Sequence, residues 1–181
     1  QALLLDLDDT LLMNDMEIFL PRYFQALVAK VQTELPATPF VEALREATHA
    51  MAVNDGRNGT NEQVFDAVFY PKLGRTKSEL QPLFDAFYAE DFESLRRLTE
   101  PDPMARAVVE LAFSQGYRVA IATQPLFPRS AILARLRWAG VGAEEFAYAA
   151  ITSYETMSAC KPHSLFFNTL AQRVGCDPRE C

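Results

Sequence analysis

The 181-residue sequence predicts an α/β fold whose parallel sheet is interrupted by one long helical insertion. Near both ends of the chain, short apolar runs that stop at polar residues alternate with helical patterns, which is typical of a parallel sheet with right-handed crossovers. From about residue 17 to residue 98, by contrast, apolar residues recur only at helical spacing. The insertion therefore separates the first strand from the rest of the sheet.

The first strand is predicted at residues 2–5. Its apolar residues run directly into the sequence Asp6-Leu7-Asp8-Asp9-Thr10, and a short apolar run that ends in this way is typical of a buried parallel strand. Open α/β sheets bind ligands at the carboxyl ends of their strands. The acidic segment is therefore a candidate site.

The helical insertion shows breaks at residues 36–39, 54–61 and 71–74, where proline, glycine and asparagine gather. In the polar loop at 54–61, we predict that Arg57 and Asn58 bind the distal part of a substrate. The alternative is an ordinary interhelical loop in which Thr60 or Asn61 caps the next helix, and for any single residue this alternative is favoured because turn and cap chemistry explains the composition.

The α/β pattern resumes after Pro101. The predicted elements are a helix at 104–114, a strand at 117–123, a helix at 128–139, a weaker strand at 147–152 and a helix at 162–174. Each of the three helices is followed by a glycine, the residue that most often ends a helix. Strands and helices thus alternate to the end of the sequence.

Asp6 and Asp8 are two residues apart, so their side chains start on the same side of extended backbone. Two neighbouring carboxylates repel each other unless a cation lies beside them. A hard divalent cation such as Mg²⁺ takes oxygen ligands and would relieve that repulsion. A solvated acidic turn is the alternative interpretation of this pair by itself.

Three further polar residues converge on the same chemistry. Thr10 follows the acids, where its hydroxyl would bind a carboxylate or cap the turn. Thr123 ends the second strand, just before Gln124, where a hydroxyl and free backbone N–H groups suit a phosphate oxygen. Lys161 precedes a helix and would neutralise a carboxylate and a phosphate. Taken singly, each is equally well a turn residue or a surface charge.

The segment Leu4-Leu5-Asp6-Leu7-Asp8-Asp9-Thr10-Leu11 resembles the first motif of the haloacid dehalogenase-like (HAD) superfamily, and Thr123 and Lys161 match its second and third motifs. Residues 122–128 also resemble a subgroup of largely uncharacterised HAD hydrolases. The resemblance implies a Rossmann-like core made of residues 1–13 and 100–181, with an all-helical C1-type cap at 14–99. Linkers near 13–15 and 100–103 would act as its hinge.

The resemblance also implies an enzyme: a Mg²⁺-dependent phosphatase that hydrolyses a small phosphorylated metabolite through an aspartyl phosphate. Asp6 would be the nucleophile and Asp8 the acid and base, while Thr123 and Lys161 would stabilise the phosphoryl oxygens. Mg²⁺ would contact Asp6, the Asp8 carbonyl and an acid of a fourth motif beyond Cys181. The predicted substrate-binding residues are Thr10 and Gln124 beside the motifs, together with Arg57 and Asn58 of the polar loop.

Two alternatives to hydrolysis stay open. A phosphotransferase or phosphomutase would use the same Asp6 but pass the phosphoryl group to an alcohol or a sugar. A catalytically impaired binding protein on the same fold is the other alternative. Because the sequence starts at Gln1 directly before a strand and stops where the fourth-motif strand would begin, we expect the printed chain to be incomplete.

The composition excludes several other classes. A net charge of -7 argues against a protein that coats nucleic acid. No apolar run is long enough to span a membrane, and no signal peptide is recognisable. The three cysteines form no C-x-x-C pair, so we expect reduced thiols in a cytoplasmic protein, without zinc or a disulfide scaffold. The expected partner is a small phosphorylated molecule; the oligomeric state is open.

Overall fold

Strands from distant parts of the chain meet in one parallel sheet in the computed structural model, which describes all 181 residues. The order is β1 (Ala2–Leu5), β4 (Arg118–Ile121) and β5 (Ala150–Ile151), with Leu5 opposite Ile121 and Ile121 opposite Ile151. Because the strands are parallel, their carboxyl ends lie at the same end of the sheet. The predicted α/β fold with a parallel sheet is confirmed.

β4 and β5 are shorter than the sequence pattern suggests. Beyond Ile121 the chain leaves the ladder, and the Thr123 carbonyl accepts a hydrogen bond of 2.7 Å from the Thr152 side chain. Apolar residues alone therefore overestimate both strands, because the residues that follow them build polar contacts instead.

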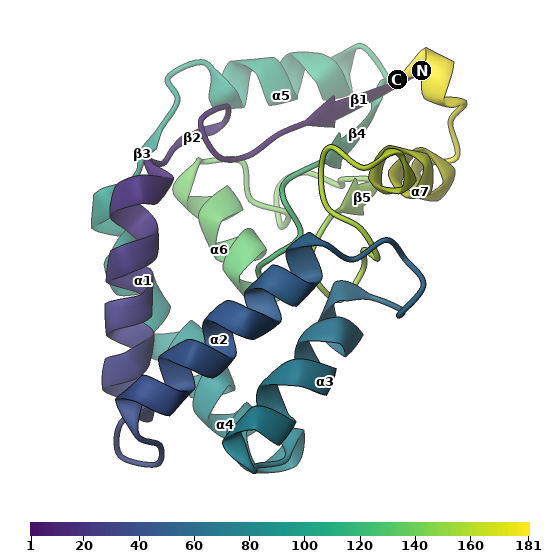
Figure 1. Cartoon of the computed structure of the whole chain (residues 1–181). Helices are drawn as coiled ribbons and strands as arrows, with labels where there is room; N and C mark the ends of the chain where they lie inside the picture. Colours follow the sequence, from purple (N-terminus) through teal and green to yellow (C-terminus); the bar gives the residue numbers. More distant parts are fainter.

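Helices cover both faces of the sheet: α5 (Ala105–Ser114), α6 (Arg129–Trp138) and α7 (Ser164–Val174) (Figure 1). Side chains alternate along a strand, so Ala120 and Ile121 point to opposite faces. Ala120 packs in a small apolar cluster with Phe166 of α7, whereas Ile121 packs in the larger cluster that contains residues of α5 and α6.

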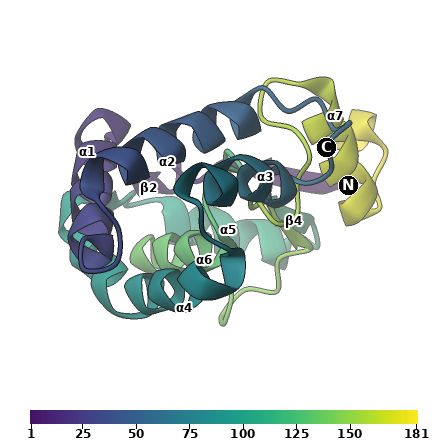
Figure 2. The ribbon, with the colours of Figure 1, turned by 60° about the horizontal axis from the view of Figure 1, so that its bottom comes forward.

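The insertion is helical throughout. It consists of α1 (Met16–Val31), α2 (Ala37–Ala52), α3 (Asn61–Leu73), α4 (Lys77–Ala86), a π-helical turn η1 (Phe87–Asp91) and a 3-10 segment η2 (Phe92–Leu98). Figures 1 and 2 show α1 to α4 grouped together as one body, apart from α7. The predicted helical insertion is thus present, as expected for a helical cap.

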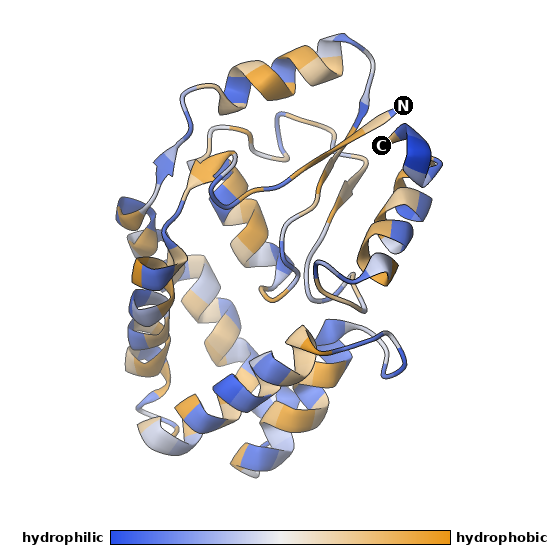
Figure 3. Ribbon diagram, turned by 45° about the horizontal axis from the view of Figure 1, so that its top comes forward, coloured by the Kyte–Doolittle hydropathy of each residue, from blue (hydrophilic) through white to orange (hydrophobic).

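Amphipathic sequence explains why these helices pack. In α2 the buried residues recur at intervals of three and four, a spacing that lines one helix face: Phe40, Ala43, Leu44, Ala47 and Met51. Figure 3 shows the resulting mixture of hydrophobic and hydrophilic residues along the helices. None of the helices in the structure combines the length and hydropathy needed to cross a membrane.

The chain enters and leaves the insertion through a two-stranded antiparallel ribbon. β2 (Leu12–Met13) pairs with β3 (Glu100–Pro101), so the two connections lie side by side. Two residues per strand are too few for a hydrophobic pattern to predict. The exact division of the chain at residues 13–14 and 99–100 stays a prediction.

The inserted helices also contact the α/β part away from this ribbon, and two of these contacts are the most extensively bonded. At the first, the Phe92 ring stacks on Trp138 of α6 with centroids 5.1 Å apart, and the Trp138 indole donates a 2.7 Å hydrogen bond to Glu93. This contact extends the large apolar cluster from the insertion into the α/β part.

The second place, which we call the Asn61 clamp, consists of the hydrogen bonds made by the first residue of α3. The fully buried Asn61 donates from its backbone to the Met157 carbonyl (2.8 Å) and from its side chain to the Pro125 carbonyl (3.0 Å). Its side-chain oxygen accepts a hydrogen bond from Asn54 (3.0 Å). The clamp thus joins the insertion to the loops that follow β4 and β5.

Candidate active site

Asp6 and Lys161 form an ion pair at the carboxyl end of β1. The Lys161 ammonium lies 2.7 Å from Asp6 Oδ2, and the backbone N–H of Leu7 donates to Asp6 Oδ1 at 2.8 Å. The Asp6 side chain keeps 42% of its surface exposed. A carboxylate held in this way is oriented and still accessible to a ligand.

Gln124 holds the Lys161 backbone in place. Its side-chain oxygen accepts a hydrogen bond from Lys161 N at 2.8 Å, and its amide nitrogen donates to Lys161 O at 3.2 Å. Both polar groups of the Gln124 side-chain amide are therefore already hydrogen-bonded. Its predicted contact with substrate stays a prediction, while the structure shows that Gln124 ties the second-motif segment to the third.

Asp8 lies in a denser polar environment than Asp6. Its Oδ1 accepts hydrogen bonds of 2.8 Å from Asn14 and 2.8 Å from Arg135, whose Nη1 also lies 2.9 Å from Oδ2. The Thr123 hydroxyl points at the same carboxylate, 3.5 Å from Oδ2. The structure therefore brings Asp6, Asp8, Thr123 and Lys161 to one end of the sheet, as the sequence predicts; their roles in the reaction stay predictions.

Sequence reasoning missed Arg135. This α6 residue has no exposed surface, its Nε and Nη2 have no hydrogen-bond partner, and its guanidinium carbon lies 4.5 Å from the centre of the Phe127 ring. The available signal was its position among apolar residues on the buried side of the helix, since arginine is rarely buried without a partner.

The remaining acidic residue of this segment, Asp9, has a structural role in the turn after β1. Asp9 adopts a left-handed conformation with φ of 55°, and its side chain accepts a hydrogen bond of 3.2 Å from the backbone of Asn14. The Leu7 carbonyl accepts hydrogen bonds from three following N–H groups, which closes the turn. Asp9 therefore maintains the loop that positions Asp8.

Three predicted substrate-binding residues lie on the surface. Thr10 is exposed, and so are Arg57 and Asn58 in the loop of the insertion. The Arg57 side chain is 87% exposed and pairs with Asp55 at 3.3 Å. None of the three forms a hydrogen bond or an ion pair with Asp6, whose bonds are to Lys161 and the Leu7 backbone, so their contact with substrate stays a prediction. In the 54–61 loop it is Asn54 and Asn61 that are buried.

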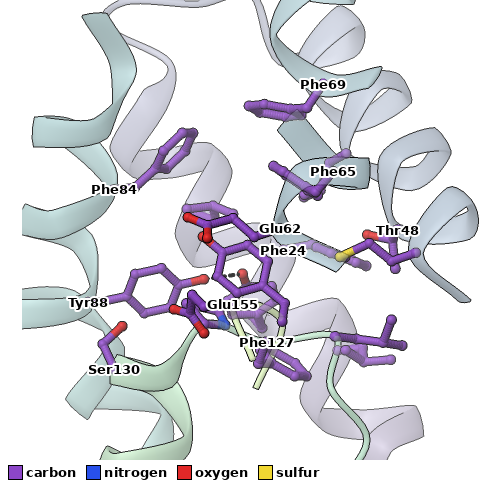
Figure 4. A pocket seen from close by; sticks show the side chains of 18 of the residues that line it. Phe24, Thr48, Glu62, Phe65, Phe69, Phe84, Tyr88, Phe127, Ser130 and Glu155 are labelled. Atoms are coloured by element: carbon purple, nitrogen blue, oxygen red, sulfur yellow. Dashed lines mark hydrogen bonds between the residues drawn. The ribbon is translucent and has the colours of Figure 1, made fainter. Parts of the chain in front are cut away.

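A cavity of about 430 Å³ opens between the inserted helices and the candidate site. Of the candidate site, Asp8 and Gln124 line this cavity, whereas Asp6, Thr123 and Lys161 lie outside its lining; the Phe127 ring also contributes, and the rest is formed largely by side chains of α1, α3 and α4. Its volume is within the usual range for small-molecule sites. Figure 4 shows aromatic rings around much of this space.

The oxygen atoms of Asp6 and of the neighbouring backbone are of the kind that a hard cation binds. No group of three or more His, Cys, Asp or Glu side chains lies close enough to hold a metal ion alone. Mg²⁺ usually binds through one or two carboxylates and completes its shell with water and phosphate oxygens. The Asp6 carboxylate and the Asp8 carbonyl fit that limited role, because the Asp8 carboxylate is already engaged by Asn14 and Arg135.

Comparison with known proteins is consistent with this geometry. A family model described as haloacid dehalogenase-like hydrolase matches residues 1–181. No protein of curated function matches the chain significantly. Among solved structures, a proposed β-phosphoglucomutase from Thermotoga maritima is 21% identical, with a TM-score of 0.50 over 98% of this chain and 72% of that one.

Two further solved structures are similar to the chain. A predicted phosphoglycolate phosphatase from Haemophilus somnus is 18% identical over 97% of this chain and 72% of that one, with a TM-score of 0.49. An L-2-haloacid dehalogenase from Xanthobacter autotrophicus is also 18% identical, over 98% of this chain and 66% of that one, with a TM-score of 0.47. At such identities structural likeness bears on the fold alone, and the reaction has to be argued from the site.

Proposed function

Because the chain belongs to the haloacid dehalogenase-like hydrolase family, we propose that it is a Mg²⁺-dependent phosphatase whose nucleophile is Asp6. The observation that carries this proposal is the difference between the two carboxylates. Asp6 is accessible and held by one ammonium, whereas Asp8 is fixed alongside by Arg135 and Asn14. One acid is therefore free to attack a substrate, and the other is positioned to move a proton.

In the first step, a carboxylate oxygen of Asp6 forms a bond to phosphorus while the bond from phosphorus to the ester oxygen breaks. The ester oxygen takes a proton from Asp8 and leaves as the alcohol. Lys161 stabilises the negative charge on the transferred oxygens, and Thr123 supplies a hydroxyl on the same side.

In the second step, Asp8 accepts a proton from water as the water oxygen attacks the phosphorus of the aspartyl phosphate. The bond between phosphorus and Asp6 breaks, which releases inorganic phosphate and restores the carboxylate. Bound Mg²⁺, held by the Asp6 carboxylate and the Asp8 carbonyl, would neutralise part of the phosphate charge. The aromatic cavity would take the organic part of the substrate.

The test is phosphate release from p-nitrophenyl phosphate and from a panel of small phosphomonoesters, with Mg²⁺ and after chelation with EDTA. We expect Mg²⁺-dependent release that falls on the order of 10³-fold or more in Asp6→Asn. Asp9→Asn is the matched control: it removes a neighbouring carboxylate, while asparagine tolerates the left-handed conformation and its side-chain oxygen still accepts the hydrogen bond from the Asn14 backbone, so the loop that positions Asp8 is kept. Substantial release by Asp6→Asn, or full activity without any divalent cation, would refute the proposal.

The same experiment separates hydrolysis from transfer. With ³²P-labelled substrate, acid quenching should trap label on the wild-type chain and none on Asp6→Asn. Hydrolysis sends that label to inorganic phosphate. Label recovered in an added alcohol or sugar, with little inorganic phosphate, would assign a phosphotransferase instead.

A further inference from the structure

The cavity beside Asp8 is lined by aromatic rings from several elements. Figure 4 shows Phe65, Phe69 and Phe84 around one end and Phe127 near the other, with Tyr88 between. Phe127 is the ring in contact with Arg135, the partner of Asp8, so its end of the cavity is the one near the reacting groups. The other three rings therefore surround the part of a ligand that lies farthest from its phosphate.

Some polar side chains of the cavity wall are already engaged. The Tyr23 and Tyr88 hydroxyls lie 2.7 Å apart, Gln81 donates to Asp85 at 2.7 Å, and the Glu155 carboxylate accepts a hydrogen bond of 2.9 Å from the Arg129 backbone. Other hydroxyl groups of the wall, those of Thr48, Tyr70, Ser130 and Tyr154, line the cavity and can bind a ligand. The preference of the cavity therefore has to come from its aromatic rings and its charges.

The charges of the wall disfavour a second anion. Glu62, Asp85 and Glu155 contribute carboxylates, and the single lysine of the wall, Lys77, lies 2.6 Å from Glu62. Partial burial lowers the pKa of Lys77, but hydrogen bonds to Asp66 and Glu62 outweigh it and raise the pKa above its ordinary value. The Lys77 ammonium is thus charged, and the neighbouring carboxylates of Glu62 and Asp66 already neutralise it.

We infer that the substrate is the phosphate monoester of an arylalkyl alcohol, with one aromatic group on a short chain and no second acidic group. Aromatic rings bind other rings by stacking and edge-to-face contact, which the walls at Phe65, Phe69 and Phe84 offer. The inference rests on the proposed phosphatase activity. In that reaction the arylalkyl alcohol leaves with the proton from Asp8, while the phosphoryl group passes to Asp6.

The first test compares alkyl phosphates whose leaving groups are chemically similar: 2-(2-naphthyl)ethyl phosphate, n-propyl phosphate and 2-phosphoglycolate. We expect kcat/KM to be about tenfold to a hundredfold higher for the naphthylethyl ester than for the propyl ester, as burial of an aromatic group implies. The value for phosphoglycolate should be the lowest. Equal values for the two uncharged esters, or a preference for phosphoglycolate, would overturn the inference without affecting the proposed function.

A pair of variants locates the preference in the cavity. Thr48 lines the cavity from α2, so Thr48→Phe should fill it and bring the naphthylethyl-to-propyl ratio close to one. Thr38→Phe makes the same change at an exposed position of the same helix and should keep the wild-type ratio. A ratio that both variants keep would place the aromatic group elsewhere and overturn the inference.

Binding of the product alcohol tests the cavity without any chemistry. Calorimetric titration with 2-(2-naphthyl)ethanol should show binding to the wild type and to Thr38→Phe, with at least tenfold weaker binding to Thr48→Phe. Absence of binding to the wild type would overturn the inference. Binding with this pattern in a protein that releases no phosphate from any ester would support the cavity assignment and refute the phosphatase proposal, so the two failures are distinguishable.

Discussion

The guanidinium of Arg135 holds both carboxylate oxygens of Asp8, with Nη1 2.8 Å from Oδ1 and 2.9 Å from Oδ2. The arginine is completely buried, and Asp8 keeps 17% of its side-chain surface exposed. The pair therefore spans the boundary between the apolar core and the cavity. In the proposed mechanism Arg135 is a positioning residue: its charge compensates the carboxylate, and its place in α6 determines where the oxygens of the proposed acid and base lie.

We predict that Arg135→Met destabilises the protein by about 3 kcal/mol, because it leaves the Asp8 carboxylate without its buried partner. Asp8→Asn should also destabilise, since it leaves a buried guanidinium unpaired. The double variant should lose less stability than the sum of the two single losses. The difference, which is the coupling energy of the pair, should be about 1–3 kcal/mol. Urea unfolding of the four proteins measures this coupling; strictly additive losses would show that the pair contributes nothing.

Asp8→Asn should also separate the two chemical steps. With p-nitrophenyl phosphate, whose leaving group needs no protonation, the variant should release one equivalent of nitrophenol rapidly and then turn over slowly, because water is no longer deprotonated. Stopped-flow absorbance measures the burst. With n-propyl phosphate we expect no burst, since that alcohol needs the proton. Equal losses for the two esters in single-turnover experiments would contradict the acid role of Asp8.

Asn61→Ala should destabilise the protein by roughly 1–3 kcal/mol, because it leaves the Pro125 carbonyl without its partner and the Asn54 amide with one of its two acceptors, the Gly59 carbonyl. Asn58→Ala is the control: it makes the same change in the same loop at an exposed position and should stay within about 0.5 kcal/mol of the wild type. Chemical denaturation gives both values. Similar stabilities for the two variants would mean that the Asn61 clamp has little energetic weight.

Stability should fall above pH 10 because of the buried tyrosine pair. Burial raises the pKa of Tyr23 to about 12 and also raises that of Tyr88, while an unfolded tyrosine ionises near pH 10. Above pH 10 the unfolded chain therefore binds fewer protons than the folded one, and the free energy of unfolding decreases with pH.

Urea unfolding between pH 9 and pH 12 should record this decrease, of roughly 2–3 kcal/mol for Tyr23. Tyr23→Phe should reduce the slope because it removes one titrating group, although it also leaves the Tyr88 hydroxyl without its 2.7 Å partner. A slope unchanged by the substitution would assign the alkaline sensitivity to other groups.

The sequence predicts well the residues whose place depends on local structure. Asp6 and Thr123 lie just beyond the ends of strands, and a short apolar run is enough to locate a strand end. Hydrogen-bond partners that come from a distant helix or strand cannot be identified in this way. Arg135 lies on the buried face of α6, but its partner Asp8 is 127 positions away along the chain, and nothing in the sequence pattern identifies that partner.

The 54–61 loop is a second example. Its charged and polar composition predicts substrate contacts for Arg57 and Asn58, which stay a prediction. The side chain that connects this loop to the α/β part is that of Asn61, which Asn54 holds in place. Composition alone does not distinguish a side chain that caps or bridges backbone from one that contacts solvent, because asparagine serves in both ways.

The manner in which the inserted helices are attached has a mechanical consequence. A rigid body joined to a frame at one place swings freely, and one joined at two places still rotates about the line between them. Here the ribbon of β2 and β3 is supplemented by several other attachments, among them the stack of Phe92 on Trp138, the contact of Tyr23 with Phe127, and the Asn61 clamp. A large swing of the inserted helices about the ribbon therefore has to break these contacts. The Asn61 clamp consists of polar groups that can bind water instead, so it parts with less loss of buried apolar contact than the two aromatic contacts.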